Sequence, residues 1–230
     1  MRPAPTGPAR GAGQTLQAVL FDMDGLLVDS EPLWFEAESE VMARLGGAWS
    51  AADQRALLGG SLPRTVSYLL ARAAQPASAA DVARWLVDGM TALLTTRGPR
   101  VLPGAAELLA EVRAAGVRHA LVTSSEREIM DAVMAHVGLS FDATVCAADV
   151  RQSKPHPEPY RRAAALLGAD PRYCVALEDS PNGVAAAEAA GCRVVAVPSL
   201  VPILARPGRF VVNSLTEVGL AMLRAIAAAD

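Results

Sequence analysis

The sequence is poor in the features that most often assign a protein to a class. Its three cysteines are far apart and show no C-x-x-C spacing, which argues against a disulfide framework and predicts reduced, buried thiols in a cytoplasmic protein. No apolar run is long enough to cross a membrane, so no membrane span is expected. The net charge is only −3, which argues against a nucleic-acid partner because general nucleic-acid binders usually carry a basic face.

Aromatic residues and short cofactor motifs are scarce as well. Aromatics make up 4% of the 230 residues, against 52% hydrophobic residues in total, so the core is expected to consist of small aliphatic side chains. No GxGxxG nucleotide fingerprint is present, and the histidines have no Cys or His partner at metal-ligand spacing. The first residues, MRPAPTGPARGAGQ, lack the apolar segment of a signal peptide, so 1–14 is expected to be a disordered leader.

From Leu102 onward, predicted helices alternate with continuously apolar strands. This pattern is typical of a parallel sheet covered on both faces, so the fold class is α/β with a Rossmann-like parallel sheet. Ser125, with Glu128 three residues later, forms a capping box that predicts the start of one helix. The expected helices lie at 104–115, 125–137, 157–167, 182–190 and the C-terminus, and the expected strands at 117–123, 143–147, 173–180, 192–198 and 209–212.

Residues 31–100 show helical patterns and no strand signal. Helices are expected after Ser30 and at 51–58, 63–74 and 79–96. This predicts a small helical cap domain at 30–100, inserted into a core domain made of 15–29 and 101–230, with hinges near 29–30 and 100–103. An insertion there would sit above the carboxyl ends of the strands, where open α/β sheets bind ligands.

The stretch VLFDMDGLLVD places Asp22 and Asp24 at the end of a strand that reads as buried. A hairpin turn at Asp24-Gly25 explains the second acid but not the first. A calcium loop fails because Leu26 and Leu27 stand where a ligand and a glycine are required. The remaining interpretation is a carboxylate pair that takes part in chemistry.

Three distant features favour the chemical interpretation. Glu178 and Asp179 end another strand, and carboxylates that converge from two strand ends suit Mg²⁺. The hydroxyl residues 123–125 end a third strand before a helix and form a candidate anion site. Lys154 is the only lysine beside 20 arginines, so a compact ammonium rather than a planar guanidinium is indicated at that position.

With these motifs in this order, the chain resembles the haloacid-dehalogenase superfamily, in its β-phosphoglucomutase-like branch. The segments DGLLVDSEPLW and ALEDSPNG look similar to those of bacterial hexose-phosphate phosphatases, including enzymes that act on 2-deoxyglucose 6-phosphate. The resemblance implies a phosphoric monoester hydrolase that acts on a small phosphorylated metabolite, with a sugar phosphate as the expected substrate. It also implies Mg²⁺ as cofactor and an aspartyl-phosphate intermediate.

The resemblance also implies a role for each motif residue. Asp22 would be the nucleophile, and Asp24 would protonate the leaving group and then activate water. Lys154 would neutralise the phosphoryl oxygens, and Thr123 with Ser124 would bind them. The metal would be held by Asp22, the carbonyl of Asp24, Asp179 and, through water or a hydrogen bond, Glu178.

The cap loop GGSLPRT is the candidate for contacting the leaving group, through Gly60, Ser61 and Arg64. Arg64 has an alternative interpretation as a solvated charge at a helix start.

The alternative function is a phosphosugar mutase, although Trp34 stands where the mutase has a histidine and the mutase's cap lysines are absent here. A non-catalytic binding protein is a more distant alternative. A monomer is expected for a capped unit of this size.

Overall fold

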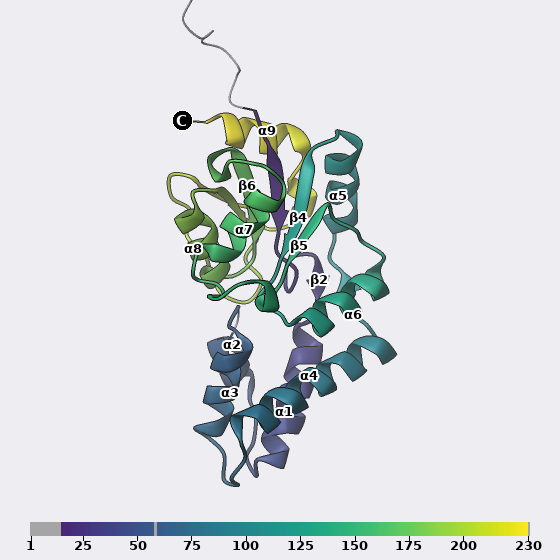
Figure 1. Ribbon diagram of the computed structural model, residues 1–230, viewed down its shortest axis with the longest axis vertical. Coiled ribbons are helices and arrows are strands. Elements are labelled where there is room, and N and C mark those ends of the chain that lie inside the picture. Colours follow the sequence, from purple (N-terminus) through teal and green to yellow (C-terminus); the bar gives the residue numbers. More distant parts are fainter. Residues whose placement is uncertain (1–14, 58, 230) are drawn as a thin grey trace, which may run out of the picture.

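The computed structural model describes residues 15–57 and 59–229, and its centre is a parallel sheet of six strands (Figure 1). The strand order is β5-β4-β1-β6-β7-β8. After β1 the chain builds β4 and β5 on one side of β1, and it then crosses to the other side of β1 to form β6. Ligands bind in open α/β sheets at such a reversal of strand order, which here is surrounded by the carboxyl ends of β1, β4 and β6. The strands are β1 Ala18–Phe21, β4 Arg118–Val122, β5 Ala143–Val145, β6 Cys174–Glu178, β7 Arg193–Ala196 and β8 Arg209–Val211.

Helices cover both faces of the sheet, as the sequence predicted. Side chains of a strand alternate between its two faces. In β1, Val19 and Phe21 therefore pack in one buried cluster and Ala18 and Leu20 in another. The first cluster is covered by α5 Ala105–Ala114, α6 Arg127–Val137 and α9 Leu220–Ala228, and the second by α7 Glu158–Leu166 and α8 Pro181–Ala190.

Four helices lie between the first strands and the rest of the sheet and form a separate helical unit below the core (Figure 1). They are α1 Glu31–Arg44, α2 Ala51–Leu57, α3 Leu62–Leu70 and α4 Ala79–Thr96. The unit has a small core of its own, which includes Leu45, Leu69 and Leu86. We call this unit the cap; its bounds at 30–100, and those of the core at 15–29 and 101–230, stay predictions.

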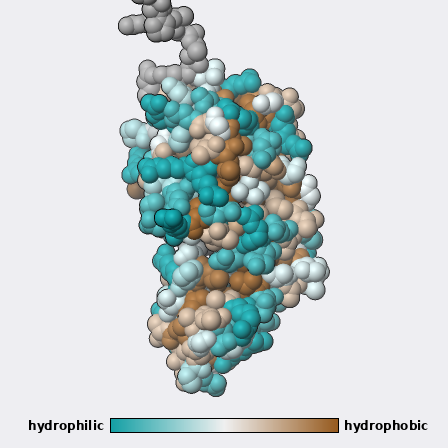
Figure 2. Space-filling view, in the orientation of Figure 1, coloured by the Kyte–Doolittle hydropathy of each residue, from teal (hydrophilic) through white to brown (hydrophobic). Residues whose placement is uncertain are grey.

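The cap also packs directly on the core. Leu33 and Ala37 of α1 and Met90 and Leu94 of α4 belong to the same buried cluster as the sheet residues. In the view of Figure 2, hydrophobic surface gathers where the cap meets the core. The cap is therefore seated against the carboxyl end of the sheet.

Two short strands join the cap to the core, and the sequence analysis missed them. β2 Val28–Asp29 and β3 Arg100–Val101 pair antiparallel, and Arg100 Nη2 lies 2.6 Å from Asp29 Oδ2. The sequence placed a hinge at each of these positions but gave no sign that the two hinges pair. Two residues per strand are too few for an alternating pattern to appear.

Two local predictions about helix ends were wrong. The helix expected over 63–74 ends at Leu70, because the next residues tighten into i→i+3 bonds such as Arg72 N to Leu69 O. Ser125 does not cap a helix: α6 begins at Arg127, and the Ser125 hydroxyl donates to Asp24 Oδ2 instead. A hydrogen bond to a distant carboxylate has thus replaced the local capping bond.

The remaining global predictions have different outcomes. The predicted leader, 1–14, lies outside the described residues. Across 15–57 and 59–229, no helix combines the length and apolar character that crossing a bilayer requires. The expectations of a monomer and of a cytoplasmic location stay predictions.

Candidate active site

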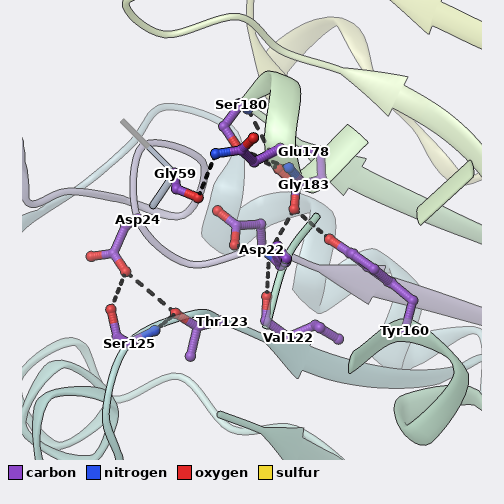
Figure 3. Close-up of polar contacts among 12 residues, drawn as sticks. Asp22, Asp24, Gly59, Val122, Thr123, Ser125, Tyr160, Glu178, Ser180 and Gly183 are labelled. Atoms are coloured by element: carbon purple, nitrogen blue, oxygen red, sulfur yellow. Dashed lines mark hydrogen bonds and ion pairs between the residues drawn. The ribbon is translucent and has the colours of Figure 1, made fainter. Parts of the chain in front are cut away.

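Polar side chains from three neighbouring strand ends meet at the carboxyl edge of the sheet (Figure 3). Asp22 follows β1, Thr123 follows β4, and Glu178 and Asp179 end β6. The strands pair in register, with Phe21 opposite Leu121 on one side and Leu177 on the other. The predicted acids and hydroxyls therefore converge because neighbouring parallel strands end at the same level.

Lys154 lies at the centre of this group and is almost completely buried. Its Nζ donates to Asp22 Oδ1 at 2.5 Å, to Glu178 Oε1 at 2.6 Å and to the Val122 carbonyl at 2.8 Å. These three bonds use all three donors of the ammonium group. Tyr160, which is fully buried, donates its hydroxyl to the same Glu178 oxygen at 2.5 Å.

The site contains more negative charge than its single ammonium group can neutralise. Burial raises the pKa of Asp22 above its usual range; Lys154 opposes this shift, but Glu178 and Asp179 add to it. Burial and the repulsion from Glu178 raise the pKa of Asp179 in the same way. For Lys154, burial alone would lower the pKa, but the two carboxylates raise it above its ordinary value.

The acidic residues fit a hard divalent cation. One carboxylate oxygen from each of Asp22, Glu178 and Asp179 lies within 4.8 Å of the others. Clustered carboxylate oxygens are the ligands that Mg²⁺ and Ca²⁺ prefer, and such a cation would offset the charge excess described above. Ser199 donates its hydroxyl to Asp179 Oδ2 at 2.6 Å and orients that carboxylate.

Two glycines allow the backbone to approach these carboxylates. A Cβ at Gly183 would lie 1.9 Å from the Glu178 carboxyl group. A Cβ at Gly25 would lie 2.2 Å from Asp179 Oδ2, and Gly25 has a left-handed backbone with φ +81°. Both positions exclude a side chain for steric reasons.

Gly25→Ala is expected to displace Asp179 and weaken the affinity for Mg²⁺ by about tenfold or more, because a misplaced ligand or its support typically costs that much. The affinity is measured by calorimetric titration of the protein with Mg²⁺. Gly116→Ala is the matched control, since Gly116 also has a positive φ (+67°) but no neighbouring atom within 4 Å of the added Cβ.

Both substitutions carry the backbone strain of a side chain at positive φ, about 1 kcal/mol. The clash with Asp179 is present only at Gly25. Equal metal affinities in the two variants would show that Asp179 is not placed by this glycine.

Asp24 lies beside the charged cluster and accepts bonds from both parts of the molecule. Ser30 Oγ and Trp34 Nε1, at the entrance to the cap, donate to Oδ1 at 2.6 and 3.5 Å. From the core, Ser125 and Thr123 donate to Oδ2 at 2.8 and 3.4 Å. Asp24 is thus fixed where the cap joins the core.

A cavity of about 90 Å³ lies between the core and the cap. The core contributes the strand-end residues described above, including Asp22, Asp24 and Lys154. A hydroxyl predicted to bind substrate, that of Ser124, is buried there and has no hydrogen-bond partner within 15–57 and 59–229. From the cap side the lining residues are Glu31, Trp34, Glu38, Gln54, Leu57, Gly59, Gly60, Leu62 and Thr65.

The cap loop makes only part of the predicted contribution. Gly60 lines the cavity, but among the described lining residues Ser61 and Arg64 do not occur. Arg64 Nη2 donates to the Ala56 carbonyl at 2.8 Å, within the cap itself. The structure therefore does not bring the Arg64 guanidinium to the cavity, which matches the alternative interpretation of a charge at a helix start.

The same loop closes one side of the cavity through a contact with the core. Asn182 Nδ2 donates to the Gly59 carbonyl at 3.1 Å (Figure 3). A Cβ at Gly59 would lie 2.6 Å from Ser180 Oγ, so only a glycine allows the loop to come this close. The cap thus rests on the N-terminal end of α8, directly after Asp179.

Several residues of the site escaped the sequence analysis. Tyr160 and Ser199 donate hydrogen bonds to Glu178 and Asp179, but neither residue belongs to a recognisable sequence motif. Glu31, Glu38 and Gln54 line the cavity from the cap. The spacing of Glu31 and Glu38, seven residues apart on one helix face, was the available signal.

Comparisons with known proteins agree with this geometry. A sequence model of the haloacid dehalogenase-like hydrolase family matches residues 16–191. Hexitol phosphatase B of Escherichia coli strain K12 is 39% identical over 219 residues, which cover 93% of this chain and 95% of the relative. The predicted resemblance to this superfamily is confirmed.

Solved structures extend the comparison to the whole fold. CbbY from Rhodobacter sphaeroides, in complex with xylulose-1,5-bisphosphate, is 31% identical with a TM-score of 0.83, and the match covers 91% of this chain and 99% of that one. A β-phosphoglucomutase from Clostridium difficile has a TM-score of 0.79 at 22% identity, covering 92% and 97%. The predicted α/β core with a helical cap, in the β-phosphoglucomutase-like branch, is confirmed.

Proposed function

Because the chain belongs to the haloacid dehalogenase-like hydrolase family, we propose that it is a Mg²⁺-dependent phosphatase of small sugar-phosphate-like metabolites. One observation carries the proposal. The carboxylate of Asp22 opens into the cavity while its Oδ1 is held by the buried ammonium of Lys154. A carboxylate beside a fixed positive charge is suited to attack an anionic phosphoryl group.

In the proposed reaction, an Asp22 oxygen attacks phosphorus and the ester bond to the leaving group breaks. This forms an aspartyl-phosphate. Lys154, with its charge beside Asp22, reduces the repulsion between the carboxylate and the approaching phosphoryl oxygens. Thr123 and Ser124 both line the cavity. The Ser124 hydroxyl, which has no partner in the described part of the chain, would donate to a phosphoryl oxygen.

Asp24 is the proposed proton carrier. In the first step it gives a proton to the oxygen of the leaving group, and in the second it takes a proton from the water that attacks the aspartyl-phosphate. Phosphate then leaves and Asp22 is regenerated. Its four hydrogen-bond donors support this role because they hold its carboxylate facing the cavity.

Asp22, Asp179 and the carbonyl of Asp24 would hold Mg²⁺, and Glu178 would support the site. When bound, the ion supplies positive charge that orients the phosphoryl group and stabilises its transition state. Glu178 has a second role within the chain, since its Oε1 accepts a hydrogen bond from the Lys154 ammonium and helps to hold it beside Asp22.

Removal of divalent metal is expected to abolish phosphate release, and added Mg²⁺ is expected to restore it. The proposed reason is that the buried acids cannot approach a phosphoryl group without a neutralising cation. The measurement is phosphate release from a panel of sugar and hexitol phosphates after treatment with EDTA. Full activity in metal-free protein would contradict the proposed cofactor, and no activity on the whole panel would contradict the proposed reaction.

A phosphosugar mutase on this fold is the alternative. Returning the phosphoryl group to a sugar monophosphate creates a bisphosphate, so a mutase needs positive charge at both ends of its cavity. On the cap side, the described lining residues include no Lys or Arg, which supports hydrolysis. A coupled assay that converts β-glucose 1-phosphate into glucose 6-phosphate separates the two reactions.

A further inference from the structure

The cap side of the cavity contains two carboxylates on one helix face. Glu31 and Glu38 both lie on α1, and Trp34 lies between them on the same face. All three line the cavity opposite the strand ends. Acids at this place are unexpected beside a site that binds an anionic phosphoryl group.

Glu38 has an unmet need for a hydrogen-bond donor. Its side chain is buried, with 5% of the residue's surface exposed, and its Oε2 has no partner among the described residues. Burial raises the pKa of Glu38 to about 8, although the nearby Trp49 indole N–H opposes this shift. That N–H makes no hydrogen bond of its own within the described residues. A buried carboxyl oxygen without a partner is costly, so a donor from a bound molecule would stabilise it.

Glu31 is fixed in position by a neighbouring amide. Gln54 Nε2 donates to Glu31 Oε2 at 3.0 Å and to the Glu31 carbonyl at 2.7 Å. Burial, with repulsion from Asp24 and Glu38, raises the pKa of Glu31 to about 7. The cap therefore presents two carboxyl groups, and an anion could lie beside either one only if that carboxyl took up a proton or moved away.

No positive charge compensates for these acids. Lys154 is the only Lys or Arg among the described lining residues, and all three of its donors are used at the strand ends. Arg64 turns to the Ala56 carbonyl instead of the cavity. The leaving group of the substrate therefore meets two carboxyl groups and, among the described lining residues on the cap side, no Lys or Arg.

We infer that Glu31 and Glu38 are specificity-determining residues, which accept hydrogen bonds from the hydroxyls of an uncharged leaving group and exclude substrates with a second anionic group. This inference rests on the proposed phosphatase activity. It distinguishes the chain from its relative whose solved structure holds a bisphosphate, although the two folds are alike.

The test compares two substrates that differ in one group. Glucitol 6-phosphate and 6-phosphogluconate have the same carbon chain, but a neutral CH₂OH in the first is a carboxylate in the second. The measured quantity is the ratio of their kcat/KM values. We expect the protein to favour glucitol 6-phosphate by about 100-fold or more, since buried groups left unpaired or repelled give discrimination of this order.

The ratio is measured at pH 9, above the pKa values of about 7 and about 8, where both carboxyl groups are ionised. Glu31→Gln and Glu38→Gln keep the shape and one acceptor oxygen but remove this negative charge. Each is expected to lower the ratio by about tenfold, mainly through better use of 6-phosphogluconate. Glu40→Gln is the matched control, because Glu40 is an exposed acid of the same helix and should leave the ratio unchanged. Either cavity variant alone is sufficient for the test.

Para-nitrophenyl phosphate, which has no hydroxyl groups to recognise, separates this inference from the proposed function. Suppose that para-nitrophenyl phosphate is hydrolysed in the presence of Mg²⁺ but the ratio of kcat/KM values is near one, or is the same in both cavity variants as in the unmodified protein. The specificity inference is then wrong, while the proposed phosphatase activity still holds. If none of the three phosphates is hydrolysed, both the proposed function and the inference are overturned.

Discussion

Asp22→Asn is expected to reduce Mg²⁺-dependent phosphate release by about 10⁴-fold or more, because removing a covalent nucleophile costs at least this much in comparable systems. The amide has nearly the same shape but cannot form the aspartyl-phosphate. The fold should remain intact, since Lys154 keeps its bonds to Glu178 and the Val122 carbonyl. Phosphate release and the thermal unfolding midpoint are measured on the same samples.

The matched control for this substitution is Asp88→Asn, at an exposed position on α4 of the cap. It makes the same chemical change far from the strand ends, and its activity is expected to match that of the unmodified protein. A rate for Asp22→Asn within tenfold of the unmodified rate would mean that another group attacks phosphorus.

Lys154→Arg is expected to be almost as damaging, although it keeps the charge. The Lys154 side chain is only 3% exposed and its three partners surround a compact ammonium. A planar guanidinium is larger and presents its donors in a fixed fork. We expect a loss of about 10³-fold in kcat, as for other lost electrostatic contacts to the reacting group, and about 1–3 kcal/mol of stability from overpacking.

Phosphate-release kinetics and urea unfolding measure these two effects. Arg151→Lys is the control, because it makes the reverse exchange at an exposed position three residues earlier and should change neither quantity. If Lys154→Arg retained normal kcat, the site would need only a positive charge, and the presence of lysine in a chain of 20 arginines would have no catalytic meaning.

The strand-end residues could be predicted because their placement follows from topology alone. Parallel strands that neighbour each other end at the same edge, so Asp22, Thr123 and Asp179 had to converge once the sheet was identified. Lys154 was found differently, from the contrast with the chain's many arginines. Both arguments use residue type and sequence position and require no knowledge of how the cap packs.

The residues that sequence reasoning misplaced depend on packing between distant segments. Ser125 has a good local capping pattern, but the carboxylate of Asp24 offers its hydroxyl a stronger, charged acceptor. Arg64 lies in the first turn of α3, in the cap, and its guanidinium donates to the Ala56 carbonyl instead of entering the cavity. The spacing of Glu31 and Glu38 places them on one helix face, but that face meets the cavity only because α1 packs on the core, a contact between distant segments.

The paired strands β2 and β3 have a consequence for how such enzymes diversify. Because Asp29 and Arg100 are direct partners in the ribbon, the chain leaves the catalytic domain and returns to it at neighbouring points. A helical insert of different length or sequence could be exchanged at this junction while the strand ends keep their register. New substrate preferences could thus arise by replacing one contiguous module, with the reaction chemistry inherited unchanged.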